Sequence, residues 1–494
     1  VNVTTGCGGT NAITGLLDAW QDSVPVIFVS GNVNRPHMAP DGVRNLGVQE
    51  ANIIDIVKPI TKYSVVVNNP EDIDEVMKDA IRIATHGRPG PVWIDIPMDV
   101  QGAEFVTVED LVKQAERPLI LAGNGINCAD ARDEFKNFIL RTNIPVVTSY
   151  NGVDLISSND PNYVGRVGVK GTRAGNFAMQ NCDLLLVIGC RLPVPVTGYN
   201  YTTFAREAKV VVVDIDRDEH SKETVKIDRF IHRDAKDFFN NNKFFGSRTD
   251  WNETCLRWRD QWPVCPDKNL SEKVDLYYFT KCLNDLKRED DVVISDAGSS
   301  FYVCSQATTI TDKQRYITSS SQAEMGFTIP ACIGAAFAKG GDVIGVTGDG
   351  SFMMNLQELQ TIAHYNLPVK LFVWNNDGYL SIRTTQKKFF EGREIGTDES
   401  SGVSIPNIKY VVKSFGIEYV RADVDCLEGS IATALDYNGP IVCEVFCEKW
   451  QEVVPTMQGR KNADGTISAP PLEDMYPFLS REEFYDNMII KPLD

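Results

Sequence analysis

Short, almost uninterrupted runs of apolar residues recur along the chain, and the segments between them carry apolar residues at helical spacing. Such runs are typical of strands in a parallel sheet, because helices cover both faces of that sheet. The runs gather in three groups, within residues 1–100, 117–245 and 275–455. The pattern therefore predicts an α/β fold made of three doubly wound parallel-sheet domains.

Each group contains several strand-like runs. The first has PVIFVSGN and PVWIDIP, with a helix expected around residues 70–86 between them. The second has RPLILAGNG, IPVVTS, DLLLVIGCR and KVVVVDID. The third has DDVVISDAG, DVIGVTGDG, LPVKLFVWNN and PIVCEVFCE. We expect the following boundaries: a first domain at 1–115, a central domain at 116–248, a tryptophan-rich linker at 249–274, a third domain at 275–455 and a polar tail at 456–494.

The first and third groups repeat each other weakly. GCGGTNAITGLLDAWQDSVPVIFVSGN (6–32) aligns with GDGSFMMNLQELQTIAHYNLPVKLFVWNN (348–376) as glycine turn, helix, Pro-Val, apolar strand and asparagine. Two homologous domains on either side of a third would explain this match. The alternative left open is that any two strand–turn–helix units share these features.

Charge and composition narrow the classes of partner. The formal net charge is -18, and no run of Lys and Arg that could bind phosphate backbones is present, which argues against nucleic acid. No segment reaches the roughly 20 apolar residues of a membrane span, and no basic segment followed by an apolar core begins the chain. We therefore expect a cytoplasmic protein that acts on a small molecule. The start at Val1, directly in an apolar run, also suggests that an upstream strand and helix are missing.

The cysteines and histidines do not form a recognisable metal or disulfide pattern. The 12 cysteines include no CxxC pair, and several lie within apolar runs, so buried reduced thiols are favoured over a disulfide framework or a zinc site. The five histidines are scattered. Of these, His37 follows a predicted strand and is the one expected to border a site.

The segment 348–376 carries the clearest chemistry. Its GDG turn follows an apolar strand and precedes a helix, an arrangement that presents backbone N–H groups to an anion such as phosphate. The turn has no lysine, so it is not a nucleoside-triphosphate loop, and the Asp349 carboxylate would repel phosphate unless a cation lay between them. Asn375 and Asn376 end the next strand at the same edge of the sheet. These oxygen ligands predict Mg²⁺ bound together with a diphosphate.

With this turn and spacing, the segment resembles the GDG-to-NN motif of thiamin diphosphate-dependent decarboxylases and carboligases. The resemblance extends along nearly the whole chain and is greatest to acetolactate synthases. The stretches that carry it, in order, are TTGCGGTNAITGLLDAWQDSVPVIFVSG, VQEANI, KPITKY, GPVWIDIP, VGVKGTRAGNFAMQNCDLLLVIGCR, VTG, VVVVDID, AEMGFTIPACIGAA, GDGSFMMNLQEL and LPVKLFVWNN. It implies a pyrimidine-binding domain, a central nucleotide-binding-like domain and a diphosphate-binding domain.

The resemblance also implies roles for residues at matching positions. Asp349, Asn376 and the carbonyl of Gly378 would bind Mg²⁺. The cofactor's diphosphate would be held from two strand ends, by the following residues: Gly350, Ser351, Gly298, Ser299 and Ser300. Met325 matches the bulky apolar residue that keeps the cofactor bent, whereas without the resemblance a core methionine would be the simpler prediction. Gln49 and Glu50 match positions that face the reaction site.

In the family the cofactor attacks a 2-keto acid and accepts electrons as CO₂ leaves. Forming its ylid requires a glutamate, which in relatives lies before the strand with which this chain begins, so the resemblance places it upstream of Val1. Because active sites form between subunits, it implies a homodimer or homotetramer that takes a 2-keto acid and a carbonyl acceptor.

Three departures from acetolactate synthases bear on ligand and substrate. Pro193-Val194-Pro195 replaces an acidic-acidic-Arg run, so that FAD in the central domain is left open. Val48 replaces an aromatic residue and Thr385 a tryptophan, which predicts a roomier acceptor site. The cations that could meet a polar acceptor, or else form a solvated charged face, are Arg383, Lys387 and Lys388.

These departures leave four functions open. The favoured one is a carboligase of the acetolactate synthase type that uses pyruvate or a related 2-keto acid. The alternatives are a simple 2-keto acid decarboxylase, a carboligase that acts on branched sugars, and a homologue that binds thiamin diphosphate without catalysis.

Overall fold

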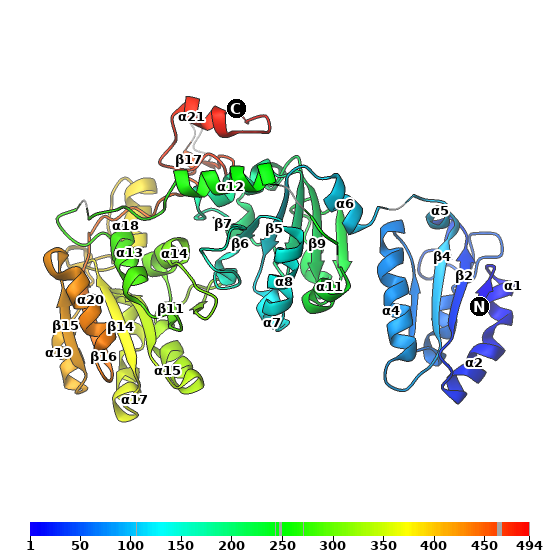
Figure 1. Cartoon of the computed structure of the whole chain (residues 1–494), viewed down its shortest axis with the longest axis horizontal. Coiled ribbons are helices and arrows are strands. Elements are labelled where there is room, and N and C mark those ends of the chain that lie inside the picture. Colours follow the sequence, from blue (N-terminus) through cyan, green and yellow to red (C-terminus); the bar gives the residue numbers. More distant parts are fainter. Residues whose placement is uncertain (105, 243, 247–248, 270, 462–466, 494) are drawn as a thin grey trace. The chain divides into compact units, whose positions relative to one another are not determined.

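The computed structural model describes residues 1–104, 106–242, 244–246, 249–269, 271–461 and 467–493. The chain forms two compact units, Val1–Gln114 and Ala115–Asp494, which are described separately. Three parallel sheets carry the fold, one in the first unit and two in the second (Figure 1). The predicted fold class of three parallel-sheet α/β domains is confirmed. Among the described residues, no helix is both long and apolar enough to cross a lipid bilayer.

The first unit is a four-stranded sheet with the order β1-β2-β4-β3. Its strands are β1 (Asn2–Val3), β2 (Ile27–Asn32), β3 (Tyr63–Val66) and β4 (Val92–Pro97). The helices are α1 (Cys7–Asn11), α2 (Ile13–Asp22), α3 (Ile53–Val57), α4 (Ile73–Thr85), α5 (Met98–Gln101) and α6 (Val108–Gln114). Along β4, Val92 and Ile94 pack against α4, whereas Trp93 packs against α2 and α3 on the other face (Figure 1). Covering both faces explains why this strand is apolar at successive positions.

The central domain is a six-stranded sheet with the order β10-β9-β8-β5-β6-β7. Its strands are β5 (Pro118–Ala122), β6 (Val146–Thr148), β7 (Tyr163–Arg166), β8 (Leu184–Ile188), β9 (Lys209–Asp214) and β10 (Arg229–His232). Its helices are α7 (Gly125–Cys128), α8 (Arg132–Thr142), α9 (Arg173–Asn181), α10 (Val194–Thr197) and α11 (Ala235–Asn241). The strands β5 and β8 are buried at every position, as their unbroken apolar runs predict.

The third domain is a six-stranded sheet with the order β12-β11-β13-β14-β16-β15. Its strands are β11 (Val292–Ser295), β12 (Arg315–Thr318), β13 (Val343–Gly348), β14 (Val369–Asn375), β15 (Glu418–Ala422) and β16 (Ile441–Phe446). Its helices are α13 (Leu276–Leu286), α14 (Gly298–Ala307), α15 (Thr328–Lys339), α16 (Asp349–Met354), α17 (Leu359–His364), α18 (Leu380–Phe389), α19 (Ile408–Ser414) and α20 (Leu427–Asp436). All of its strand pairs are parallel, so all strands end at one edge.

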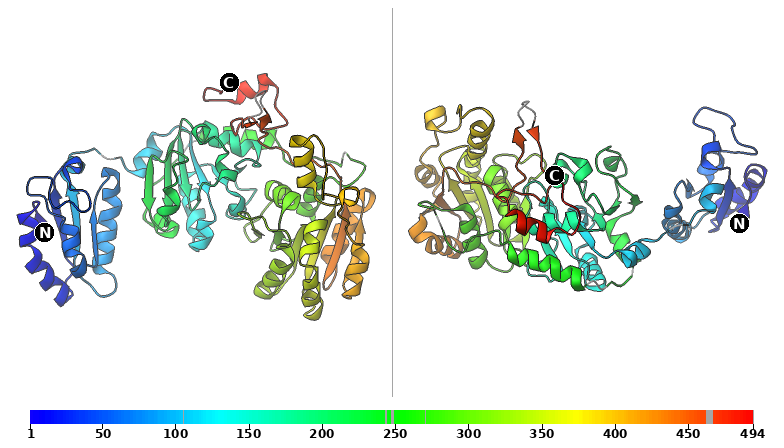
Figure 2. Two further views of the ribbon diagram at one scale, coloured as in Figure 1. Left: turned by 180° about the vertical axis from the view of Figure 1, so that it is seen from behind. Right: turned by 90° about the horizontal axis from the view of Figure 1, so that it is seen from above.

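The stretch expected as a linker contains a helix that belongs to a core. Helix α12 (Thr249–Gln261) carries Trp258, whose side chain is fully buried and lies with its ring centroid 5.7 Å from that of Phe177 in α9. Its indole Nε1 donates to Asn487 of the C-terminal helix α21 (Arg481–Asn487) over 2.8 Å. In the front and top views, α21 (red) runs beside α12 (green) (Figures 1 and 2). Both the linker and the tail therefore help to form the hydrophobic core of the central domain.

A buried arginine connects the central and third domains. Arg166, at the end of β7, donates from its guanidinium to the carbonyl oxygens of Gln306 at 2.9 Å and Thr308 at 2.6 Å. These carbonyls lie at the C-terminal end of α14, where a cation satisfies unpaired oxygens and interacts favourably with the helix dipole. The far end of α14 begins at Gly298 and is part of the site described below.

We predict that Trp258→Ala lowers the free energy of unfolding by about 3–5 kcal/mol, because it leaves a large cavity and an unpaired Asn487 amide oxygen. Thermal unfolding measures the effect. Glu253→Ala, at an exposed position of the same helix, is the control. Equal melting temperatures for both variants would show that α12 contributes nothing to the core.

Candidate functional site

Three neighbouring strands of the third domain each lead, at most through a short turn, into a helix at one edge of the sheet. Strand β11 leads to α14 at Gly298, β13 leads to α16 at Asp349, and β14 leads through residues 376–379 to α18. Because the strands lie side by side in the order β11-β13-β14, these turns adjoin. Ligands of open α/β sheets bind at this carboxyl edge.

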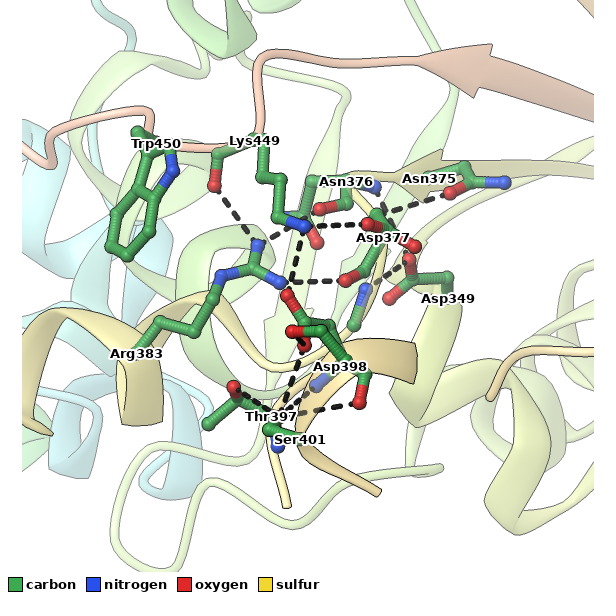
Figure 3. Close-up of polar contacts among 12 residues, drawn as sticks. Asp349, Asn375, Asn376, Asp377, Arg383, Thr397, Asp398, Ser401, Lys449 and Trp450 are labelled. Carbon is green, nitrogen blue, oxygen red and sulfur yellow. Dashed lines mark hydrogen bonds and ion pairs between the residues drawn. The ribbon is translucent and has the colours of Figure 1, made fainter. Parts of the chain in front are cut away.

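The Asp349 carboxylate joins the two ends of the predicted segment. One of its oxygens accepts from the N–H of Gly350 at 2.7 Å, and the other accepts from Asn376 at 3.2 Å and Gly378 at 2.9 Å (Figure 3). The residue is 1% exposed. Burial raises the pKa of Asp349 to about 6, although the three N–H donors act in the opposite direction. Since the pKa is raised, ionisation of this group destabilises the fold as pH rises from about 4 to 6, unless a cation offsets the charge.

The two asparagines at the end of β14 have different surroundings. The Asn375 amide donates to Glu444 at 2.6 Å and its oxygen accepts from the N–H of Asp377, so this side chain is used within the protein. Asn376 is buried, yet its side chain has no hydrogen-bond partner in the described part of the chain. The structure therefore leaves Asn376, and not Asn375, available to a ligand.

The serines at the helix starts also divide into two kinds. The hydroxyl of Ser300 is fully buried and donates to Asp296 at 2.8 Å. Asp296 is itself buried and also accepts from Thr347 at 2.8 Å, and burial raises its pKa. The hydroxyls of Ser299 and Ser351 are nearly buried, and neither has a hydrogen-bond partner among the residues described. Like Asn376, these two hydroxyls suit a polar ligand.

Two positions at this edge require glycine, because other groups of the protein lie too close for a side chain. A Cβ added to Gly350 would lie 2.2 Å from the ring of Tyr379, and one added to Gly378 would lie 2.1 Å from the carbonyl oxygen of Thr397. Gly378 also has a φ of 109°, which side chains disfavour. Glycine at these positions lets the turns of β13 and β14 pack closely around the Asp349 carboxylate.

Comparisons with known proteins match this architecture domain by domain. Residues 1–55 match the N-terminal TPP binding domain of thiamine pyrophosphate enzymes, residues 107–241 match the central domain, and residues 296–445 match the C-terminal TPP binding domain. The chain belongs to the thiamine pyrophosphate enzyme family. The C-terminal match includes the whole edge from Asp296 to Gly378 described above.

Relatives within the family are acetolactate synthases. The chain is 32% identical to the acetolactate synthase isozyme 2 large subunit of Escherichia coli over 485 residues, which are 93% of this chain and 86% of the relative. It is 32% identical to the large subunit of Parasynechococcus marenigrum over 95% of this chain and 80% of the relative. It is 30% identical to acetolactate synthase 1 of Zea mays over 92% of this chain and 76% of the relative. By this likeness it is a thiamin diphosphate-dependent enzyme of the acetolactate synthase type.

Met325, the residue predicted to support the cofactor, lies just before α15. Met325 is half-buried, and the next residue, Gly326, accepts at its carbonyl from the amide of Asn355 at 3.0 Å. A Cβ at Gly326 would lie 2.7 Å from Cβ of Met354. The loop that carries Met325 is therefore packed against the end of α16, within the same cofactor-binding domain.

In the first unit, the loop of residues 33–50 is held by an acid. The Glu50 carboxylate accepts from the N–H groups of Ala39, Leu46 and Gly47, which lower its pKa against the opposing effect of burial. The backbone carbonyl of the preceding residue, Gln49, accepts a hydrogen bond from the Thr5 hydroxyl at 3.1 Å. Glu50 thus organises the loop, and the Gln49 side chain is exposed.

This loop borders a pocket of about 530 Å³ within the first unit. Val48, which is 86% exposed, and His37 are among its lining residues, together with Asn32, Met98 and Gln101. Val48 stands where acetolactate synthases are expected to carry an aromatic residue. It is therefore a small side chain beside an open cavity.

Two glycine turns of the central domain pack closely against neighbouring backbone. A Cβ on Gly123 would lie 2.2 Å from the carbonyl oxygen of Gly189, and one on Gly168 would lie 2.0 Å from that of Pro195. These glycines are thus explained by packing of the loops on one another. Pro193 and Pro195 carry no charge or N–H that could bind a ligand. FAD in the central domain stays a prediction.

Arg383 has neither of the two roles predicted for it, contact with an acceptor or part of a solvated charged face. It is neither a solvated cation nor open to an acceptor, because its side chain is fully buried and its guanidinium donates to the backbone carbonyls of Asn376, Asp377 and Lys449. The ammonium groups of Lys387 and Lys388 lie over aromatic rings, at 4.6 Å from the Trp450 centroid and 5.3 Å from the Phe389 centroid. Sequence reasoning missed Lys449 and Asp398, which no local pattern connects to the turn.

We predict that Gly378→Ala destabilises the protein by about 1–3 kcal/mol more than Gly402→Ala. Gly402 has nearly the same φ, 105°, but open space around its Cβ position. Both variants carry the cost of left-handed backbone, of about 1–2 kcal/mol, and only Gly378→Ala meets the Thr397 carbonyl. Thermal unfolding of the two proteins side by side measures the difference, and equal losses would refute the close packing.

Proposed function

We propose that the chain is a Mg²⁺-dependent thiamin diphosphate carboligase that decarboxylates pyruvate or a related 2-keto acid and joins the two-carbon unit to a carbonyl acceptor. The observation that carries the proposal is the buried Asp349 carboxylate, which gathers both ends of the β13–α16–β14 unit at the edge where three helices begin. A buried acid with no cationic side chain bonded to it suits a metal ion bridging to phosphate.

In the proposed site, Asp349, the Asn376 amide oxygen and the Gly378 carbonyl bind Mg²⁺. The groups proposed to hold the diphosphate are N–H groups at the starts of α14 and α16 and the free hydroxyls, from Gly298, Ser299 and Ser351. Gly350, whose own N–H donates to Asp349, is proposed to let the backbone approach the diphosphate closely. Ser300, expected at the same position, would act indirectly, because its hydroxyl holds Asp296. Met325 is proposed as the apolar support that keeps the cofactor bent.

When bound, thiamin diphosphate supplies the electron sink for decarboxylation. The chain's own groups bind it, orient it and exclude water from its reacting end. We propose Gln49, on the loop held by Glu50, as a residue that faces the substrate. Assembly into a homodimer or homotetramer with active sites between subunits stays a prediction.

The pocket beside Val48 supports a carboligase over a simple decarboxylase. An aldehyde-releasing enzyme needs no second binding site, whereas a cavity of about 530 Å³ next to a small side chain can admit a carbonyl compound larger than pyruvate. A keto sugar is one such acceptor. No step of this reaction is assigned to FAD.

We predict that Asn376→Ser lowers the affinity for Mg²⁺ in the presence of thiamin diphosphate by more than about 100-fold, since it removes a ligand and not only an outer partner. Asn375→Ser, one position away and bonded to Glu444, is the control. Calorimetric titration measures binding, and CO₂ release and product analysis with pyruvate, with and without added carbonyl compounds, measure the reaction. Equal losses in the two variants would contradict the metal assignment. Acetolactate formed from pyruvate alone as fast as with any added acceptor would rule out the larger acceptor.

Binding of Mg²⁺ is also predicted to depend on pH. The metal requires the ionised carboxylate, and burial holds the pKa of Asp349 at about 6, so protons compete with the metal below that pH. We expect the affinity to be constant near pH 7 and above, and to fall by up to about tenfold per unit below pH 6. Titrations of wild-type protein between pH 5 and 8 test this, and a flat profile would show that Asp349 is not a ligand.

A further inference from the structure

The backbone turn of residues 376–378 is held from the side opposite Asp349 by Arg383. This guanidinium donates to the carbonyl of Asp377 at 2.6 Å and, through its other terminal nitrogen, to those of Asn376 at 2.8 Å and Lys449 at 2.9 Å (Figure 3). Arg383 is 0% exposed, and its guanidinium lies 5.5 Å from the ring centroid of Trp450. The partners of this buried cation are backbone carbonyls and not a carboxylate. Its desolvation is offset only if those carbonyl oxygens are held in place.

A second cation connects the same turn to a neighbouring loop. The Lys449 ammonium lies between the carboxylates of Asp377, at 2.7 Å, and Asp398, at 2.8 Å (Figure 3). Asp398 also accepts from the hydroxyls of Ser400 and Ser401, and Lys449 is the largest cause that holds its pKa far below the usual range. This loop packs on Gly378 through the Thr397 carbonyl, which accepts from the N–H of Tyr379 at 2.8 Å.

Together these contacts leave one carbonyl of the turn free. The oxygens of Asn376 and Asp377 both accept from Arg383, whereas that of Gly378 has no hydrogen-bond partner among the described residues. The turn's N–H groups at Asn376 and Gly378 are meanwhile bonded to Asp349. Contacts on both sides thus fix the orientation of these peptide groups before any ligand binds.

We propose that Arg383 and Lys449 form a cationic brace that positions the turn for metal binding, a role that rests on the proposed function. The brace occupies the two competing carbonyls and leaves the Gly378 oxygen to the metal. Both are positioning residues, since they act through the turn and not on the substrate. Because Mg²⁺ requires near-ideal octahedral geometry and Ca²⁺ tolerates irregular ligands, a rigid turn favours Mg²⁺ over Ca²⁺.

The test compares Arg383→Lys, Lys449→Met and Lys387→Met in the full chain. Arg383→Lys keeps the charge but loses the planar fork that reaches three carbonyls. Lys449→Met removes a cation that is one-third exposed, which keeps the test available should Arg383→Lys fail to fold. Lys387→Met is the matched control, because Lys387 lies over the same Trp450 ring and has no hydrogen bond to the turn in the described residues. Calorimetry with thiamin diphosphate measures affinity for Mg²⁺ and, separately, for Ca²⁺.

We expect the two brace variants to bind Mg²⁺ about 10–100-fold more weakly, as is typical when an outer partner of a metal ligand is removed, with a clearly smaller loss for Ca²⁺. Hydrogen exchange of the cofactor-free proteins should show faster exchange of the Asn376 and Gly378 amides in these variants only. Unchanged Mg²⁺ affinity, or equal losses for both cations, would overturn the brace. If wild-type protein binds neither cation with thiamin diphosphate, the proposed function itself fails, whatever the exchange data show.

Discussion

The buried carboxylate of Asp349 is the interaction on which the candidate site depends. Removing a charge from water is costly, and the protein offsets the cost with three backbone N–H donors from two separate turns. Bringing these donors together requires glycine where the turns touch, at Gly350 and Gly378. Even so, burial raises the pKa of Asp349 against the effect of these donors. The remaining deficit is what a bound cation would supply.

The turn after β14 has its backbone groups bonded on two sides, with the Gly378 carbonyl left without a partner among the described residues. The N–H groups of Asn376 and Gly378 donate to the Asp349 carboxylate, and the carbonyls of Asn376 and Asp377 accept from the Arg383 guanidinium. The same separation occurs among side chains, since Asn375 and Ser300 are used inside the protein while Asn376 and Ser299 are not. Among the described residues, neighbours of one type thus divide into those bonded within the protein and those proposed to face a ligand.

The sequence predicted the strands at the centre of each sheet, because these are uniformly apolar and buried on both faces. It missed β3, β7, β10, β12 and β15, all of which lie at sheet edges. Four of them are only partly buried and have a mixed pattern, whereas β7 is buried throughout but is short and contains a glycine and an arginine. At the site, Asp349 and Asn376 were predictable because a single strand–helix–strand unit carries both. Arg383 was misjudged because a basic residue near Lys387 and Lys388 resembles a solvated face. Lys449 and Asp398 reach the turn from distant segments, and only the folded chain brings them there.

The contact between Arg166 and α14 has a consequence for how the enzyme can be divided or recombined. The carbonyls at the C-terminal end of the helix that starts at Gly298 accept hydrogen bonds from Arg166, a residue of another domain. A third domain produced alone would keep every residue proposed to bind the cofactor but would expose that helix end to water. Exchange of central domains between relatives would likewise succeed only where the incoming β7 carries an arginine at the position of Arg166. The central domain is in this sense an electrostatic component of the helix proposed to face phosphate, and not a spacer.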